Sequence, residues 1–196
     1  MAVPKAGRPR RYDLHPGEGF MHPEVAYAVA ALDEALERVV DQVEDLTLDQ
    51  VRRVPEGTGL AISALVVHLA WAEAGWVARI TGARLVEELD RLLQPAGRAV
   101  PAGEVVIPEL GVVELIDLCR RVRRELTYPA LQSLTDIDAP IDDGQRTMTA
   151  RGVLLHLTWH WVYHSAHIGL LRDLVGSGYT WRFGPLGMVD EGPAEL

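Results

Sequence analysis

Four of the seven histidines in this 196-residue chain fall within the twelve-residue segment "HLTWHWVYHSAH". They are His156, His160, His164 and His167. In an α-helix, residues four apart lie on one face, so the first three form a row and the fourth lies just beyond it. Two imidazoles spaced in this way can bind one metal ion. The spacing leaves the pairs 156/160, 160/164 and 164/167 all open.

A metal site would need a further ligand from another segment, and His68 is the best candidate. It lies in "ALVVHLAWAE", the most apolar part of the chain. An unpartnered polar side chain buried there would cost roughly 1–3 kcal/mol. Three neutral imidazoles around a divalent ion would leave positions open for water or substrate, as in catalytic sites. The alternative is that each histidine is a core residue hydrogen-bonded to a carbonyl group.

The elements that carry these side chains are predicted from apolar residues that recur at three- and four-residue steps. This pattern predicts helices over about 23–46, 60–81, 110–133 and 150–175, the last capped by Thr147 or Thr149. Strand signals are weak, and a long connection separates the second helix from the third. The sequence therefore predicts an all-α, up-down-down-up four-helix bundle.

The predicted bundle covers residues 23–176. Residues 1–22 are rich in Pro, Gly and Arg, and we expect them to form a disordered N-terminal arm. Residues 177–196 lack periodicity, and we expect an irregular C-terminal tail.

The net charge and the cysteine count of the chain argue against some classes of partner and of covalent cross-link. The net charge of −9 argues against a nucleic-acid partner, because phosphate binding needs a basic face. The four arginines within residues 120–124 are expected on the solvated side of a helix. The single cysteine, Cys119, excludes an intrachain disulfide, and it fits an inert buried thiol in a cytoplasmic protein.

The apolar run over residues 60–80 has the length of a membrane span. It contains Glu73 and Arg79, whose charges would be costly in lipid. We therefore predict an internal helix of a bundle and no membrane partner.

Two segments resemble the DinB/YfiT-like superfamily of bacterial metal-binding four-helix bundles, which is related to the N-terminal domain of mycothiol-dependent maleylpyruvate isomerase. "GLAISALVVHLAWAEAGWVARITG" is similar to that family's second helix, and "TARGVLLHLTWHWVYHSAHIGLLRDLVG" to its last. The resemblance places the metal triad on His68, His160 and His164. It makes His156 a neighbour one turn earlier. His167 stands where the family often has glutamine, and the isomerase-like branch usually has glutamate at the position of His160.

The resemblance implies a metal-dependent enzyme that transfers a low-molecular-weight thiol or hydrolyses a small electrophile. The metal would be Zn²⁺ or Ni²⁺, with His167 and His156 as candidates for proton transfer. With one cysteine in the chain, the thiol would come from a small-molecule cosubstrate. We expect a homodimer. The alternative is a non-catalytic, stress-related binding or dimerising bundle whose metal site is structural or vestigial.

Overall fold

A computed structural model describes residues 4–9, 11, 13–94, 96–142, 144–145 and 147–182. Its helices are α1 (Pro23–Val43), α2 (Leu48–Arg52), α3 (Ile62–Thr81), α4 (Glu87–Leu93), α5 (Ala96–Ala99), α6 (Val112–Val122), α7 (Tyr128–Gln132) and α8 (Ala150–Leu174). Its strands are β1 (Lys5–Pro9), β2 (Pro140–Asp142), β3 (Thr147–Thr149) and β4 (Tyr179–Arg182).

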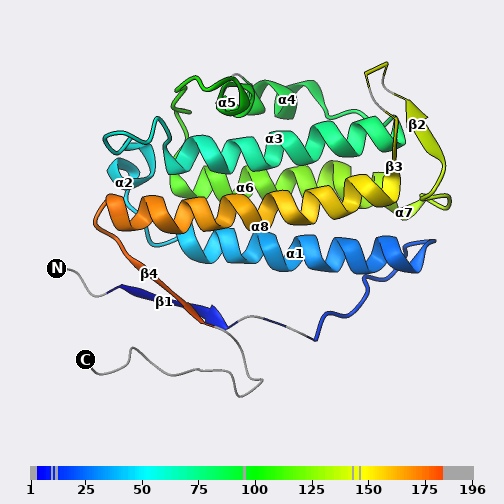
Figure 1. Cartoon of the computed structure of the whole chain (residues 1–196), viewed down its shortest axis with the longest axis horizontal. Coiled ribbons are helices and arrows are strands. Elements are labelled where there is room, and N and C mark those ends of the chain that lie inside the picture. Colours follow the sequence, from blue (N-terminus) through cyan, green and yellow to red (C-terminus); the bar gives the residue numbers. More distant parts are fainter. Residues whose placement is uncertain are drawn as a thin grey trace.

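Helices α1, α3, α6 and α8 lie side by side and form the body of the molecule (Figure 1), which confirms the predicted all-α helical bundle. In Figure 1, α1 and α8 run in one direction and α3 and α6 in the opposite one. Helix α2 joins α1 to α3 at one end of the bundle. The connection between α3 and α6 contains α4 and α5, which pack on α3.

Local signals set the ends of the main helices. The Thr149 side chain accepts a hydrogen bond from the Gly152 amide at 3.1 Å, so Thr149 rather than Thr147 caps α8. Helix α3 ends where Gly82 adopts φ 73°, a left-handed conformation that suits glycine. The predicted helix over 110–133 is present, but a π-helical turn (Arg123–Thr127) interrupts it between α6 and α7.

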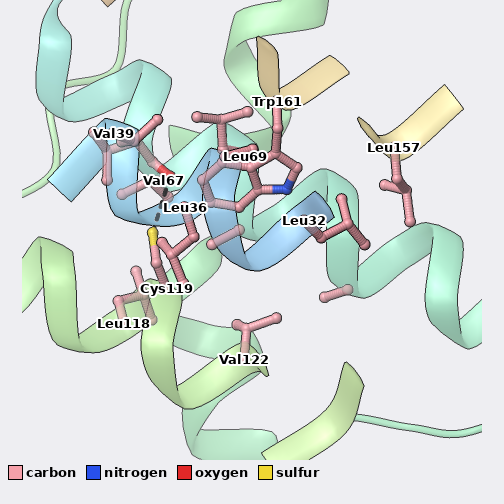
Figure 2. Close-up of a cluster of buried hydrophobic side chains, with 14 of the residues drawn as sticks. Leu32, Leu36, Val39, Val67, Leu69, Leu118, Cys119, Val122, Leu157 and Trp161 are labelled. Atoms are coloured by element: carbon pink, nitrogen blue, oxygen red, sulfur yellow. Dashed lines mark hydrogen bonds between the residues drawn. The ribbon is translucent and has the colours of Figure 1, made fainter. Parts of the chain in front are cut away.

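A cluster of buried apolar side chains from the main helices fills the centre of the bundle (Figure 2). Cys119 belongs to this cluster, with its Sγ 3.7 Å from the Val66 carbonyl oxygen. Burial raises the pKa of the Cys119 thiol to about 12. The prediction of an inert buried thiol is therefore confirmed, since the reactive form of a cysteine is the thiolate.

A buried carboxylate, that of Glu73 in α3, lies within this core. The Arg123 Nε and Nη2 atoms donate to its two oxygens at 2.7 Å each. Trp161 of α8 donates from Nε1 at 2.8 Å, and Thr127 donates from its hydroxyl at 2.5 Å. Arg123 also pairs with Asp33 of α1. One network therefore ties α1, α3, the π-helical turn and α8 together.

This network corrects one prediction. Arg123 was expected on a solvated helix face, but its side chain is 2% exposed. The π-helical turn adds a residue to the turn and directs both Arg123 and Thr127 toward Glu73. The neighbouring arginines at 120, 121 and 124 form ion pairs nearer the surface.

The predictions of a disordered arm and an irregular tail are wrong for the described residues of β1 and β4. These strands form a parallel pair in which Lys5 is opposite Tyr179. Lys5 also forms ion pairs with Asp41 and Glu44 at the end of α1, and Tyr179 donates a hydrogen bond to Asp41. Contacts between residues so far apart in the chain leave no local pattern in the sequence.

The apolar run over residues 60–80 forms most of α3, whose buried residues contribute to the core. Nowhere in the described ranges does a helix combine the length and apolar character needed to cross a membrane.

Replacing Glu73 by alanine should lower the free energy of unfolding by about 3–5 kcal/mol, because the buried Arg123 would lose its bidentate partner and keep only Asp33. The buried donors of Thr127 and Trp161 would also lose their acceptor. Urea denaturation measures this change. The matched control is Glu37→Ala, which removes an exposed ion pair with Arg120 and should cost less than about 1 kcal/mol. Equal losses in the two variants would contradict the role given to the Glu73 network.

Candidate metal centre

Helices α3 and α8 bring three imidazoles together. His68 comes from α3, and His160 and His164 come from successive turns of α8. One ring nitrogen from each residue lies within 4.8 Å of the other two. His68 is buried, and the other two are half-buried. The spacing allowed three pairs of histidines on α8. The fold brings one of them, His160 and His164, next to His68.

The second ring nitrogen of His68 has a partner that fixes the orientation of the ring. Its Nδ1 lies 2.9 Å from the carbonyl oxygen of Gly97 in α5. Because a carbonyl only accepts, Nδ1 carries the proton and Nε2 keeps its lone pair. A hydrogen bond of this kind, from the far nitrogen of a histidine, commonly orients metal ligands.

Gly97 is suited to this position because of its packing against Trp71. A Cβ atom at position 97 would lie 2.4 Å from the Cβ of Trp71, so any larger residue would push α5 away. The Trp71 ring in turn stacks on His68, with ring centroids 5.8 Å apart. Neither residue could be assigned to the site from the sequence. The segment around Gly97 has the pattern of a connection, and no local signal marks its carbonyl as a partner of His68.

The donor set fits a divalent ion that prefers nitrogen ligands. The Nε2 atoms of His68 and His160 face each other at 3.2 Å. Two imidazole nitrogens bound to one tetrahedral Zn²⁺, each at about 2.0–2.1 Å, would lie about 3.3 Å apart. These features suit a site in which an ion joins the imidazoles.

The three rings are neutral near pH 7. Burial, followed by repulsion from neighbouring imidazoles, lowers the pKa of His160 to about 3 and that of His164 to about 4. Burial also lowers the pKa of His68. The lone pairs are therefore available to a cation, since metal ligands must be deprotonated.

The triad forms one wall of a cavity of about 610 Å³. Aromatic side chains dominate the other walls, with Trp71 and Trp76 from α3 and His156 from α8. Arg79 lies over the Trp76 ring at 4.8 Å and also lines the cavity. A small molecule in this space would lie directly against the triad.

The two remaining histidines of α8 take different places. His156 lines the cavity and meets the Trp76 ring edge-on at 5.2 Å. His167 has its Nδ1 3.3 Å from the Nδ1 of His164, and it is not among the residues that line the cavity. His156 therefore faces the cavity, whereas His167 lies beside His164 and outside the cavity wall.

Comparisons with known proteins find similarity at the level of the family and of the fold. A family model described as Mycothiol-S-transferase matches residues 28–176. A comparison with curated proteins finds no match. Among solved structures, the chain is similar to the crystal structure of a conserved protein from Enterococcus faecalis, with a TM-score of 0.61 and 19% identity. The match covers 76% of this chain and 94% of the other, and at this identity it shows the fold alone.

The metal-free protein should lose stability as the pH falls from 7 to 5. The unfolded chain takes up protons on its histidines as the pH passes through about 6.5, whereas folded His164 does so only near pH 4. Protons therefore favour the unfolded state in this window. Urea denaturation in the presence of a chelator measures the effect.

The slope of stability against pH should be smaller in His164→Gln than in the parent protein, because the substitution removes one histidine whose pKa the fold lowers. The same slope in His164→Gln as in the parent would show that His164 is not held neutral by the fold.

Proposed function

The chain belongs to the Mycothiol-S-transferase family, and on this premise we propose that it is a metal-dependent enzyme that transfers a low-molecular-weight thiol to a small electrophile. One observation carries the proposal: three neutral imidazoles from two helices meet at the wall of an open cavity. A structural site would be closed by a full set of protein ligands. Here three side chains leave room for a substrate atom.

His68, His160 and His164 would hold the ion, each through one imidazole nitrogen. Zn²⁺ and Ni²⁺ both accept such ligands. When bound, the ion would lower the pKa of a thiol or water next to it and so provide a nucleophile near neutral pH. The hydrogen bond from His68 to Gly97 would keep the His68 ring in place during this chemistry.

The thiol must come from a cosubstrate, because the chain's own cysteine, Cys119, is buried in the core with its pKa raised. In the transfer, the thiol loses its proton and the sulfur forms a bond to an electrophilic carbon. The leaving group departs with the electron pair of the broken bond and, in the net reaction, takes up the proton. Water in place of the thiol would give hydrolysis of the same electrophile.

We assign the proton transfer to His156, because it lines the cavity one helical turn from His160. His167 would be a positioning residue, since it contacts His164 and does not line the cavity. The aromatic walls formed by Trp71 and Trp76 favour electrophiles with an apolar body.

A cytoplasmic location and a homodimer remain predictions that accompany this proposal. A reducing compartment would suit both the free Cys119 and a thiol cosubstrate. Light scattering of the purified protein tests the dimer.

The purified parent should bind one equivalent of Zn²⁺ or Ni²⁺. His68→Ala and His160→Ala should each lower the affinity by more than about a hundredfold, because losing only an outer partner of a ligand already costs about 10–100-fold. Titration calorimetry and metal analysis measure this. His15→Ala, at an exposed position, is the control. A parent protein that takes up neither metal would overturn the metal centre.

Thiol transfer separates this proposal from the alternative of a non-catalytic bundle. The metal-loaded parent should consume a thiol together with a model electrophile, and the rate should fall at least tenfold in His156→Phe with the metal content unchanged. If chelation lowers only the melting temperature, and neither thiol-dependent nor hydrolytic turnover is detected, the metal site is structural.

A further inference from the structure

The outward side of α8 carries large apolar side chains along most of its length. The most exposed are Leu155 at 73%, Leu170 at 62% and Trp159 at 59%. The full set, called the α8 stripe below, consists of Leu155, Trp159, Val162, Tyr163, Leu170 and Leu174. Exposed Ala166 lies within it, so positions 155, 159, 162 and 166 follow alternating steps of four and three residues. This spacing is typical of a helix that packs lengthwise on another helix.

The α8 stripe is large for a surface that faces only water. An aromatic side chain has on the order of 150–250 Å² of surface, and at the exposures found here the six side chains present roughly 700 Å². The largest apolar patch of a typical monomer covers about 300–600 Å². A stable protein–protein interface buries about 800 Å² on each partner. The α8 stripe therefore supplies most of the area that one side of an interface needs.

The charge along α8 indicates which partner suits this surface. Residues 152–171 contain no Asp, Glu, Lys or Arg, although the chain has a net charge of −9. Two copies of an acidic protein repel one another, and a segment without charged side chains is where they approach at the lowest cost. An anionic membrane surface is attracted by basic side chains, which this segment lacks. The partner favoured by these charges is a second copy of the chain.

The order of side chains along the α8 stripe fits an antiparallel pair of α8 helices. With the centre between Val162 and Tyr163, Leu155 would lie opposite Leu170 of the partner subunit. The large ring of Trp159 would lie opposite the small Ala166 of the partner subunit. A parallel pair would instead set each residue against its own copy, tryptophan against tryptophan. The antiparallel pair thus matches large side chains with small ones, as close packing requires.

We propose that the α8 stripe is the surface through which two copies of this chain associate, with their α8 helices antiparallel about a twofold axis near Val162 and Tyr163. The interface adjoins the triad, because the Tyr163 ring lies 5.2 Å from the His164 ring and 4.4 Å from that of His167. Association would hold Tyr163 in place and shield this side of α8 from water. Neither a metal nor thiol transfer enters this inference, so it does not depend on the proposed function.

The first test is sedimentation equilibrium of the full chain. The parent should have twice the mass of the 21.6-kDa chain. Val162→Glu should raise the dissociation constant of the dimer at least a hundredfold, because the twofold axis would bring two carboxylates together without water. Ala166→Glu, at an exposed position, should have the same effect and keeps the test valid if Val162→Glu does not fold.

Val113→Glu is the matched control, since it makes the same substitution at an 80% exposed valine of α6, outside the α8 stripe. This variant should dimerise as the parent does. A monomeric parent would overturn the proposal. A parent dimer that neither Val162→Glu nor Ala166→Glu weakens would show that the copies meet through another surface.

Disulfide cross-linking tests the orientation, because Cys119 is buried and an introduced cysteine is the accessible one. Val162→Cys should form a linked dimer on mild oxidation. Leu155→Cys should not link to itself, since the rise of the helix sets two copies of position 155 about 22 Å apart, far beyond disulfide reach. A mixture of Leu155→Cys and Leu170→Cys should link. Leu155→Cys that links to itself and not to Leu170→Cys would overturn the antiparallel arrangement.

Discussion

The arrangement of the bundle depends on one buried carboxylate. Glu73 is 1% exposed, and its hydrogen-bond donors come from the π-helical turn and from α8. A buried charge is tolerated only when it is paired and hydrogen-bonded, so these elements must keep one position relative to α3. His160 precedes the donor Trp161 in α8, and His68 lies in the same helix as Glu73. The network that satisfies the carboxylate therefore also sets where the imidazoles meet.

The charged network and the triad lie on different sides of α3. Glu73 is five residues beyond His68, which places the two side chains about 140° apart around an ideal helix. The ionic side is closed and contributes to stability. The side with His68 faces a cavity, and burial together with neighbouring imidazoles keeps His160 and His164 neutral. A helix that is apolar in composition can thus support a polar core on one side and a cluster of imidazoles beside a cavity on the other.

Short-range sequence patterns predict the main helices, two of their ends and the row of histidines on α8. The three- and four-residue apolar steps located the main helices, and Thr149 and Gly82 mark the ends of two of them. The histidine row on α8 also follows from helix geometry. The strand pair β1–β4 and the buried position of Arg123 did not follow, because both depend on partners far away in the chain. The four arginines within residues 120–124 give no local sign of which side chain is buried.

Two features of the site follow from local sequence: His160 and His164 share a helix face, and His68 lies in the most apolar segment. Both depend only on helical periodicity and composition. Spacing left three pairs open, and the family resemblance selected one. Only the tertiary structure brought the Nε2 atoms of His68 and His160 to 3.2 Å and placed the Gly97 carbonyl behind His68. These features arise where separate elements pack, and packing depends on the shape of the partner surface rather than on local sequence.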